Sequence, residues 1–342
     1  MSSILRATTL ALIAAPAAIP TTGLAATPGA ECLEVIVAEQ RLDCFEQAIR
    51  AALARDTAAD EQGAAAPALA TTPLPQQPQT LLERAWVVDP NSRKALVRLY
   101  HPNYGLFARY TTDVNTAPYE PLFDAFAEEG DFDSVEAKFQ LSFKARLWAD
   151  DDRDLGVWFA YTQQNQWQVY NGDLSSPFRE TNYMPELFVN LRPGIALGEW
   201  RLNQLNFGYN HQSNGRADPI SRSWDRLFVE AGIERGDFAL LAKAWTRIEL
   251  GDYEDDNPDI TDYLGYGELT GIWKAGGHSF TAMLRGNPST GKGAGQLTWM
   301  SPPLWGPMKA YAQVFSGYGE SMIDYDWNQT TFGVGVALND RL

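Results

Sequence analysis

The residues with the clearest chemical potential are a histidine and a serine two positions apart, His211 and Ser213. A hydroxyl group becomes an effective nucleophile when an adjacent base takes its proton, and an imidazole oriented by a carboxylate is a common base. Residues two apart on a β-strand project to the same side, so His211 can take the proton of Ser213. Asp225 supplies the carboxylate if its strand pairs with that of His211. These residue types predict nucleophilic hydrolysis, with Ser213 as nucleophile, His211 as general base and Asp225 as the orienting group.

The segment that carries this pair alternates like a β-strand, and the pair lies on its apolar face. After a turn at 214–219, the returning strand places Asp225 on the matching apolar face. Unpaired polar groups on such a face are costly, and mutual hydrogen bonding removes that cost. The alternative is that the His-x-Ser spacing is accidental and Asn214–Gly215 only a hairpin turn. The shared face consists of Leu205, Phe207, Tyr209, His211 and Ser213 on the first strand, and Asp225, Leu227 and Val229 on the second.

Beyond about Ala95 the sequence has period two, and its clearest run is Lys138–Leu147. The run is about as long as a strand that crosses a membrane, with polar side chains facing a wet lumen and apolar ones facing lipid. A soluble sandwich also alternates, but its strands are nearer five or six residues and its outer face is polar. The polar set is Lys138, Gln140, Ser142, Lys144 and Arg146, and the apolar set is Phe139, Leu141, Phe143, Ala145 and Leu147.

Composition supports a membrane barrel. The chain is 45% hydrophobic and 12% aromatic, yet no window supplies the ~20 consecutive apolar residues of a spanning helix. In lipid only helices and closed barrels satisfy every backbone group. At roughly 20 residues per strand and turn, the chain beyond Ala95 holds about a dozen strands. The sequence therefore predicts an all-β, antiparallel transmembrane β-barrel, most simply of twelve strands, with an N-terminal periplasmic extension. In its last strand Thr331, Gly333, Gly335 and Ala337 face inward, and Phe332, Val334, Val336 and Leu338 face outward.

Four segments are predicted along the chain. Residues 1–26 have a positive end, a short apolar core and small residues for cleavage, as in a signal peptide; an uncleaved apolar helix is the alternative. Residues 27–55 form a small helical segment, in which a Cys32–Cys44 disulfide is favoured over metal binding by the two thiols. Residues 56–83, rich in Ala, Pro, Thr and Gln, are interpreted as a linker, and 84–342 as the barrel.

Charge and motifs exclude other classes. The formal net charge of −16 argues against a nucleic-acid partner, which requires a basic patch. The sequence has no Gly-x-Ser-x-Gly motif, so it is not an α/β-hydrolase. Residues 286–293 imitate a phosphate-binding loop, but Gly293 stands where Ser or Thr is needed, and a hairpin loop is the better interpretation.

The block Tyr209–Arg216 (YNHQSNGR), with Asp218–Pro219 and Ser221–Trp224 after it, resembles the signature of the outer-membrane phospholipase A family. The resemblance extends from about Phe139 to the end of the sequence, is weak before Asp133, and is absent from the N-terminal segment and linker. It implies a twelve-stranded barrel in the outer membrane of a Gram-negative cell. It also implies a calcium-dependent phospholipase A1/A2 that hydrolyses glycerophospholipid acyl esters at sn-1 and sn-2, lysophospholipids included. Further similar blocks are Ser176–Tyr183, Asp255–Ile260 and Ser316–Ser321.

The resemblance also implies calcium and an active homodimer. The positions that match the family's calcium ligands are the carbonyl of Arg216, the hydroxyl of Ser221 and Ser175 of the partner subunit, and the family's monomer site matches Asp256. Oxygen ligands suit this hard cation, whose charge would polarise the ester carbonyl. From the residues alone, the acidic loop 252–259 is either a weak calcium site or a solvated loop. The family's usual third catalytic residue is Asn, whereas this chain has Asp225, which still orients the imidazole but is costlier to hold against lipid.

One glutamine indicates where two barrels meet. Leu155, Val157, Phe159 and Tyr161 form an apolar face that Gln163 interrupts. The family uses a glutamine at the matching position for contacts between subunits, and the alternative is an amide that binds water near the membrane interface. The rival functions left open are a non-catalytic outer-membrane channel and an adhesion barrel.

Overall fold

The structure is a computed structural model that describes residues 44, 47, 79–87, 89, 91–121, 123, 131–249 and 255–342. The chain divides into two compact units, residues 1–76 and 77–342. In the first unit the described residues are Cys44 and Gln47, both helical, and Cys44 is disulfide-bonded. Cys32, the predicted signal peptide and most of the predicted linker lie outside the described residues. No helix in the described ranges is long and apolar enough to cross a membrane.

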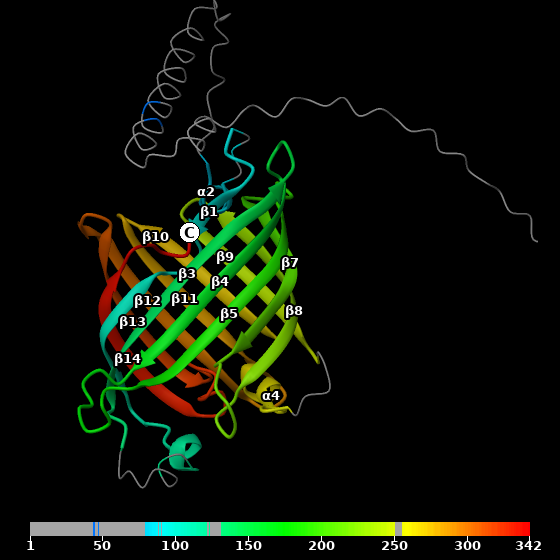
Figure 1. The fold of residues 1–342 in the computed structure, drawn as a ribbon. Helices are drawn as coiled ribbons and strands as arrows, with labels where there is room; N and C mark the ends of the chain where they lie inside the picture. The colour runs from blue at the N-terminus through cyan, green and yellow to red at the C-terminus, as the bar shows by residue number, and fades with distance from the viewer. Residues whose placement is uncertain are drawn as a thin grey trace, which may run out of the picture. The chain divides into compact units, whose positions relative to one another are not determined.

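In the described part of the second unit, twelve long antiparallel strands close into a barrel (Figure 1). Each strand pairs with the next, and β14 pairs with β2 to complete the ring. The fold class predicted from the sequence is confirmed. The strands are β2 (Tyr104–Thr111), β3 (Val135–Ala149), β4 (Leu155–Trp167), β5 (Phe178–Leu191), β7 (Trp200–Ser213), β8 (Ser223–Arg235), β9 (Phe238–Ile248), β10 (Gly267–Ala275), β11 (His278–Asn287), β12 (Lys292–Trp305), β13 (Met308–Tyr318) and β14 (Asn328–Ala337).

Two shorter strands extend the barrel wall. Strand β1 (Leu96–Leu99) pairs with β3, and β6 (Ile195–Leu197) pairs with β7. The segment that imitates a phosphate-binding loop is the β11–β12 hairpin, in which Asn287 pairs with Lys292. That interpretation of the sequence is confirmed.

The wall has its polar face inside and its apolar face outside. On β3, Lys138 and Lys144 are buried in the lumen at 1% and 3% exposure, whereas Leu141 on the outer face is 55% exposed. The last strand follows the predicted phase, with Thr331 buried and Val334 60% exposed. An apolar exterior around a polar interior is the arrangement of a barrel that sits in lipid.

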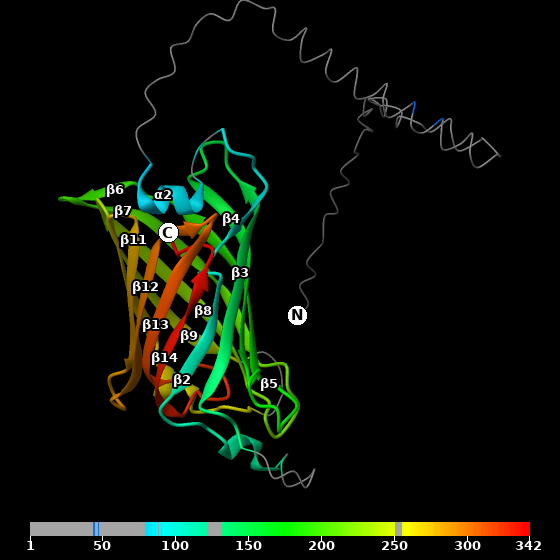
Figure 2. The same ribbon diagram turned by 90° about the vertical axis from the view of Figure 1, so that its left-hand side faces the viewer.

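The two ends of the barrel differ in the length of their connections. At one end the turns are short, as at 236–237, 276–277 and 306–307; at the other, connections such as 168–177 and 319–327 are longer. We call these the short-turn end and the long-loop end; in membrane barrels they face the periplasm and the outside, respectively. Figure 2 shows α2 (Leu81–Trp86) at the short-turn end. Helix α4 (Ile260–Leu264) and the 3-10 turn η2 (Ala117–Tyr119) belong to long-loop connections.

Helix α2 corrects the predicted end of the linker. Residues 81–83 were assigned to the linker, but they are helical, and Thr80 forms a capping box with Glu83. The helix is fixed to the lumen wall, because the Leu82 amide donates to Glu234 over 3.0 Å and the Trp86 indole donates to Gln204 over 2.7 Å. Leu82 is fully buried. The barrel unit therefore begins before residue 84, and the division between units falls after residue 76.

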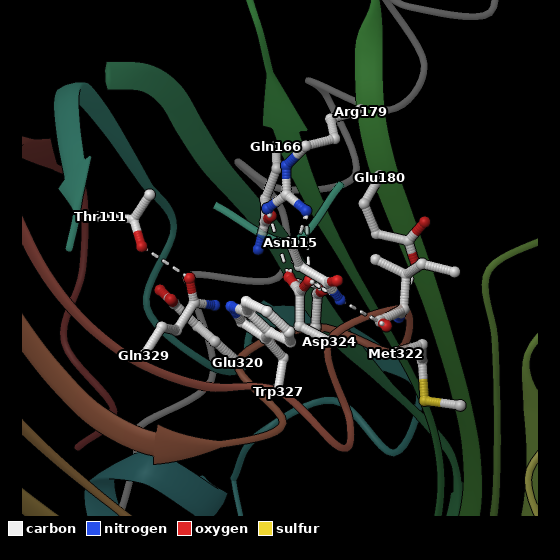
Figure 3. A network of polar contacts seen from close by, with 12 residues as sticks. Thr111, Asn115, Gln166, Arg179, Glu180, Glu320, Met322, Asp324, Trp327 and Gln329 are labelled. Atoms are coloured by element: carbon white, nitrogen blue, oxygen red, sulfur yellow. Dashed lines mark hydrogen bonds and ion pairs between the residues drawn. The ribbon is translucent and has the colours of Figure 1, made fainter. Parts of the chain in front are cut away.

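A network of buried charges lies in the lumen near the long-loop end, and Figure 3 shows the part of it around Arg179, Asp324 and Glu320. The guanidinium of Arg179 bridges Glu136 over 3.1 Å and Asp324 over 3.2 Å. Glu320 pairs with Lys138 over 2.9 Å and with Arg109. Burial alone raises the pKa of the Glu320 carboxyl, which lies in the loop after β13, but Arg109 and Lys138 hold it below its ordinary value. Three cations thus face three anions, and the β13–β14 connection is tied into the lumen.

We predict that Arg179→Met destabilises the barrel by about 3–5 kcal/mol, because it leaves the buried carboxylates of Glu136 and Asp324 uncompensated. Equilibrium unfolding in guanidinium, followed by tryptophan fluorescence in detergent, measures the change. The matched control is Arg235→Met, which removes an exposed pair with Glu199 and should cost no more than about 1 kcal/mol. Equal losses in the two variants would show that the lumen network has no special role in stability.

Candidate active site

His211 and Asp225 are held together by the pairing of β7 with β8. The two residues are direct partners in the antiparallel register, and the Nδ1 atom of His211 lies 2.9 Å from Oδ1 of Asp225. Their side chains are 34% and 20% exposed, on the same outer face as Leu227, which is 49% exposed. This contact was predicted from the sequence. It fixes the imidazole so that its second nitrogen, Nε2, remains for another partner.

The Asp225 carboxylate has a second donor that the sequence analysis did not identify. The Tyr209 hydroxyl donates to Oδ1 of Asp225, the same oxygen that contacts His211. Tyr209 precedes His211 by two residues and therefore shares its face. That alternation was visible in the sequence, but Tyr209 was assigned only to the apolar wall. A carboxylate facing lipid thus has two protein hydrogen bonds, which offset its desolvation.

Ser213 ends β7 on the same outer face, two residues after His211. It pairs with Tyr183 of β5 on one side and with Ser223 of β8 on the other. The hydrogen bonds of the described residues do not include one from its hydroxyl, so a direct bond to His211 remains a prediction. Catalytic hydrogen bonds are often long in a free enzyme and tighten when substrate binds.

The β7–β8 connection is organised by Asn214, which is 3% exposed. Its amide donates to the Ile220 carbonyl over 2.7 Å, and its Oδ1 accepts the backbone N–H of Arg222 over 3.0 Å. The connection spans 214–222, longer than the predicted turn at 214–219. Gly215 has φ +64°, and a Cβ there would lie 2.9 Å from the ring of Tyr183, so glycine is needed beside the serine.

The residues expected to bind calcium lie on three connections at the long-loop end. The structure joins two of them, because the Ser221 hydroxyl donates to Oδ2 of Asp256 over 2.6 Å. Arg216 lies on the same connection as Ser221, and its guanidinium donates to the Phe178 carbonyl over 2.9 Å. Ser175 lies on the β4–β5 connection, and no hydrogen bond of the described residues links it to the other three. Its expected role is in a second subunit.

Asn257 is a further residue of this site that sequence reasoning missed. It is fully buried, and its Oδ1 accepts the backbone N–H of Ser223 over 2.9 Å. Its own N–H donates to Asp255 over 3.1 Å. Asn257 thus couples the acidic connection to the start of β8, two residues before Asp225. In the sequence, the block Asp255–Ile260 is only similar to a block of the phospholipase A family, because nothing in the local pattern shows what Asn257 contacts.

The barrel sequence matches a known protein family. Residues 82–338 match the family model described as phospholipase A1. The chain belongs to the phospholipase A1 family. It is 42% identical over 244 residues to phospholipase A1 of Proteus vulgaris, covering 70% of this chain and 81% of that protein. It is also 42% identical over 247 residues to phospholipase A1 of Escherichia coli, covering 70% and 81%.

Solved phospholipases share the fold. Outer membrane phospholipase A from Escherichia coli superposes with a TM-score of 0.66 at 39% identity, covering 72% of this chain and 99% of that one. A Salmonella typhi outer membrane phospholipase dimer with bound calcium gives 0.66 at 38% identity, covering 72% and 93%. An active-site mutant of the E. coli enzyme, with an asparagine replaced by alanine, gives 0.69 at 36%, covering 77% and 100%. The chain is thus a phospholipase with the family's barrel.

We predict that Tyr209→Phe lowers kcat by a few-fold to about tenfold and leaves KM unchanged, because it removes one hydrogen bond to the Asp225 carboxylate without altering the surface that meets substrate. Phospholipid hydrolysis in mixed micelles, measured over a pH series, tests this. Tyr104→Phe, a buried tyrosine of the lumen, is the control and should match wild type. An equal rise in KM would assign Tyr209 to substrate binding instead.

Proposed function

We propose that this phospholipase hydrolyses glycerophospholipid acyl esters at both sn-1 and sn-2, lysophospholipids included, in the outer membrane. The observation that carries the proposal is the His211–Asp225 pair on the lipid-facing wall, in the strand that ends at Ser213. A hydrolytic group on that face can contact an acyl ester while the lipid stays in its leaflet. Residues 1–26 would serve for export, and 27–55 would remain as a disulfide-bearing extension.

The mechanism assigns one role to each residue. The Ser213 hydroxyl attacks the ester carbonyl while Nε2 of His211 takes its proton, and Asp225 stabilises the resulting imidazolium. Collapse of the tetrahedral intermediate breaks the ester bond, and His211 returns the proton to the leaving glycerol oxygen. Water, deprotonated by His211, then attacks the acyl carbonyl; the bond to the serine oxygen breaks, the fatty acid leaves, and His211 returns the proton to Ser213. Asp225 replaces the asparagine usual in the family; it holds the same tautomer and adds a negative charge beside the imidazolium.

Calcium fits the oxygen atoms that the connections after β7 and β9 bring together. The Ser221 hydroxyl and the Asp256 carboxylate lie 2.6 Å apart, and the Arg216 carbonyl belongs to the same connection as Ser221. Hydroxyl, carbonyl and carboxylate oxygens are ligands of a hard cation. When bound, the ion would supply positive charge to the ester oxygen as it becomes an oxyanion. We propose that Arg216 and Ser221 hold it with Ser175 of the partner subunit, and that Asp256 serves in the monomer.

The dimer contact lies in register with the catalytic serine. Gln163 of β4 pairs with Tyr183 of β5, which pairs with Ser213. The Gln163 amide accepts from the Tyr161 hydroxyl over 3.0 Å and donates to Asn165 over 2.9 Å. An amide has two donors and two lone pairs, so Gln163 retains one of each for a second barrel. We propose that a partner bound there lies within two strands of Ser213.

The rival function of a channel is not favoured. The lumen of the described barrel is crossed by the network around Arg179, and α2 is fixed at the other end. No observation on the described residues favours an adhesion role.

We expect Ser213→Ala to abolish hydrolysis and EDTA to abolish that of wild type, because the first removes the nucleophile and the second the oxyanion's cation. Phospholipids labelled separately at sn-1 and sn-2, with the products resolved by mass spectrometry, report both cleavage positions. Ser316→Ala, a hydroxyl paired with Thr330 elsewhere on the barrel, is the control. Wild-type activity in Ser213→Ala would contradict the role of Ser213 as nucleophile. Cleavage at sn-1 alone would limit the activity to a phospholipase A1.

Gln163→Leu should weaken calcium-induced dimerisation on the order of tenfold, because a hydrogen bond across the interface is lost in both subunits. Analytical ultracentrifugation in detergent with calcium measures it. Gln164→Leu is the matched control, since the neighbouring side chain bonds to Tyr104 instead. Unchanged dimerisation in Gln163→Leu would place the interface elsewhere on the wall.

A further inference from the structure

The barrel has a charged pocket at its short-turn end, opposite the catalytic residues. The pocket has a volume of about 520 Å³ and lies between α2, strand β1 and the residues that follow β14. Figures 1 and 2 show α2 and the C-terminus at this end. Its charged lining consists of four cations and two acids, namely Arg84, Arg98, Lys144, Arg341, Asp89 and Asp340. This excess of cations contrasts with the net negative charge of the chain.

The acids of this pocket are engaged, whereas most of its cations are not. Asp340 pairs with Lys274 over 2.6 Å and Asp89 accepts the N–H of Asn91 over 2.9 Å. Of the cations, Arg341 pairs with Glu230 over 3.2 Å. The side chains of the other three, Arg84, Arg98 and Lys144, have no ion pair or hydrogen bond to any described residue. Their N–H donors are available to an anion.

Lys144 is the most unusual of these cations. It is 3% exposed, and its ammonium lies 3.3 Å from the centre of the Trp86 ring and 5.2 Å from those of Tyr100 and Trp158. Aromatic faces attract the charge but accept its N–H donors poorly. A buried ammonium normally has an acidic partner. Here the acid that acts on it most strongly, Glu230, is ion-paired with Arg341 and does not bond to Lys144, and the ammonium lines the pocket.

The pocket opens where the barrel wall is incomplete. Strand β1 pairs with β3 alone, and β14 ends beside Tyr104, before it reaches β1. The following residues turn into the lumen, where Arg341 meets Glu230. On the outer side of β1, Val97 and Leu99 are 68% and 50% exposed. Aliphatic side chains beside cations match a lipid whose chains lie against the wall and whose headgroup enters the pocket.

We propose that this pocket binds the phosphate group of a phospholipid headgroup from the leaflet on the short-turn side, at a site separate from the hydrolytic one. Arg84 and Arg98 contact the phosphate at the mouth, and Lys144 supplies a buried donor behind them. Guanidinium groups bind phosphate oxygens in pairs, and a phosphate supplies the directly bonded acid that the Lys144 ammonium lacks among the described residues. The bound lipid fills the gap beside β1 and fastens α2 to the wall.

The test uses the full chain in neutral detergent and native mass spectrometry with an ether-linked phosphatidylglycerol, which has no ester to hydrolyse. Arg84→Gln with Arg98→Gln should weaken lipid binding on the order of tenfold, while hydrolysis of an ester-linked phospholipid in micelles stays at the wild-type rate. Both residues are at the surface, so folding is preserved. Lys144→Met tests the buried donor separately. Arg235→Gln, an arginine at the same end paired with Glu199, should bind lipid like wild type.

Two further probes distinguish the source of the phosphate. A di-ether glycerol without phosphate should bind equally to wild type and to the double variant, and inorganic phosphate should not displace the bound lipid at millimolar concentration. Lipid binding that is the same in wild type and the double variant would overturn the proposal. Displacement of the lipid by inorganic phosphate would also overturn it. So would weaker binding of the phosphate-free di-ether glycerol by the double variant than by wild type.

Discussion

Hydrocarbon offers no hydrogen-bond partner, and the structure depends on this constraint at every level. Each backbone group must be satisfied by a neighbouring strand, so the wall closes on itself through the β14–β2 pairing. Each polar side chain must turn inward or find a partner on the outer face. The few polar side chains that remain on the outer face therefore indicate a functional site. His211, Asp225 and Tyr209 form one hydrogen-bonded group on that face, and Tyr161, Gln163 and Asn165 form another.

The same constraint explains which parts of the fold were predictable. Alternation is local, so the direction of Lys138, Leu141 and Val334 could be read from the sequence, and the phase of β7 gave the face of His211. The pairing of His211 with Asp225 also followed, because both residues lie on the matching apolar faces of adjacent strands, and this phase restricts the register. Features that depend on contacts between distant parts of the chain could not be predicted from the sequence. Helix α2 follows a Pro-rich, linker-like stretch, and its contacts with Glu234 and Gln204, far along the chain, show that it is fixed to the barrel.

The site shows the same division. Residue types and spacing were sufficient to place His211 beside Asp225, but the hydrogen bonds that offset the cost of these polar groups next to lipid were not visible. Asn214 and Asn257 hold the connections through hydrogen bonds to backbone groups several residues away or on another connection. Neither position has a composition signal that distinguishes a structural asparagine from a solvated one. The proposed calcium ligands show the limit of sequence analysis, because the contact of Ser221 with Asp256 joins two connections whose relative positions a sequence does not give.

Strand register connects dimerisation to catalysis. Because Gln163, Tyr183 and Ser213 occupy successive strands in one row, strand spacing places Gln163 roughly 10 Å from Ser213 along the wall. A partner barrel bound at Gln163, as proposed above, would therefore border Ser213. Ser175 of the partner subunit would then lie at the same long-loop end. The outer wall of one barrel contacts an acyl chain on one side only. The wall of a partner barrel would contact it on the other side. In the proposed dimer, the lipid-facing position of the His211–Asp225 pair, which is costly to build, would also allow association in the membrane to complete the site.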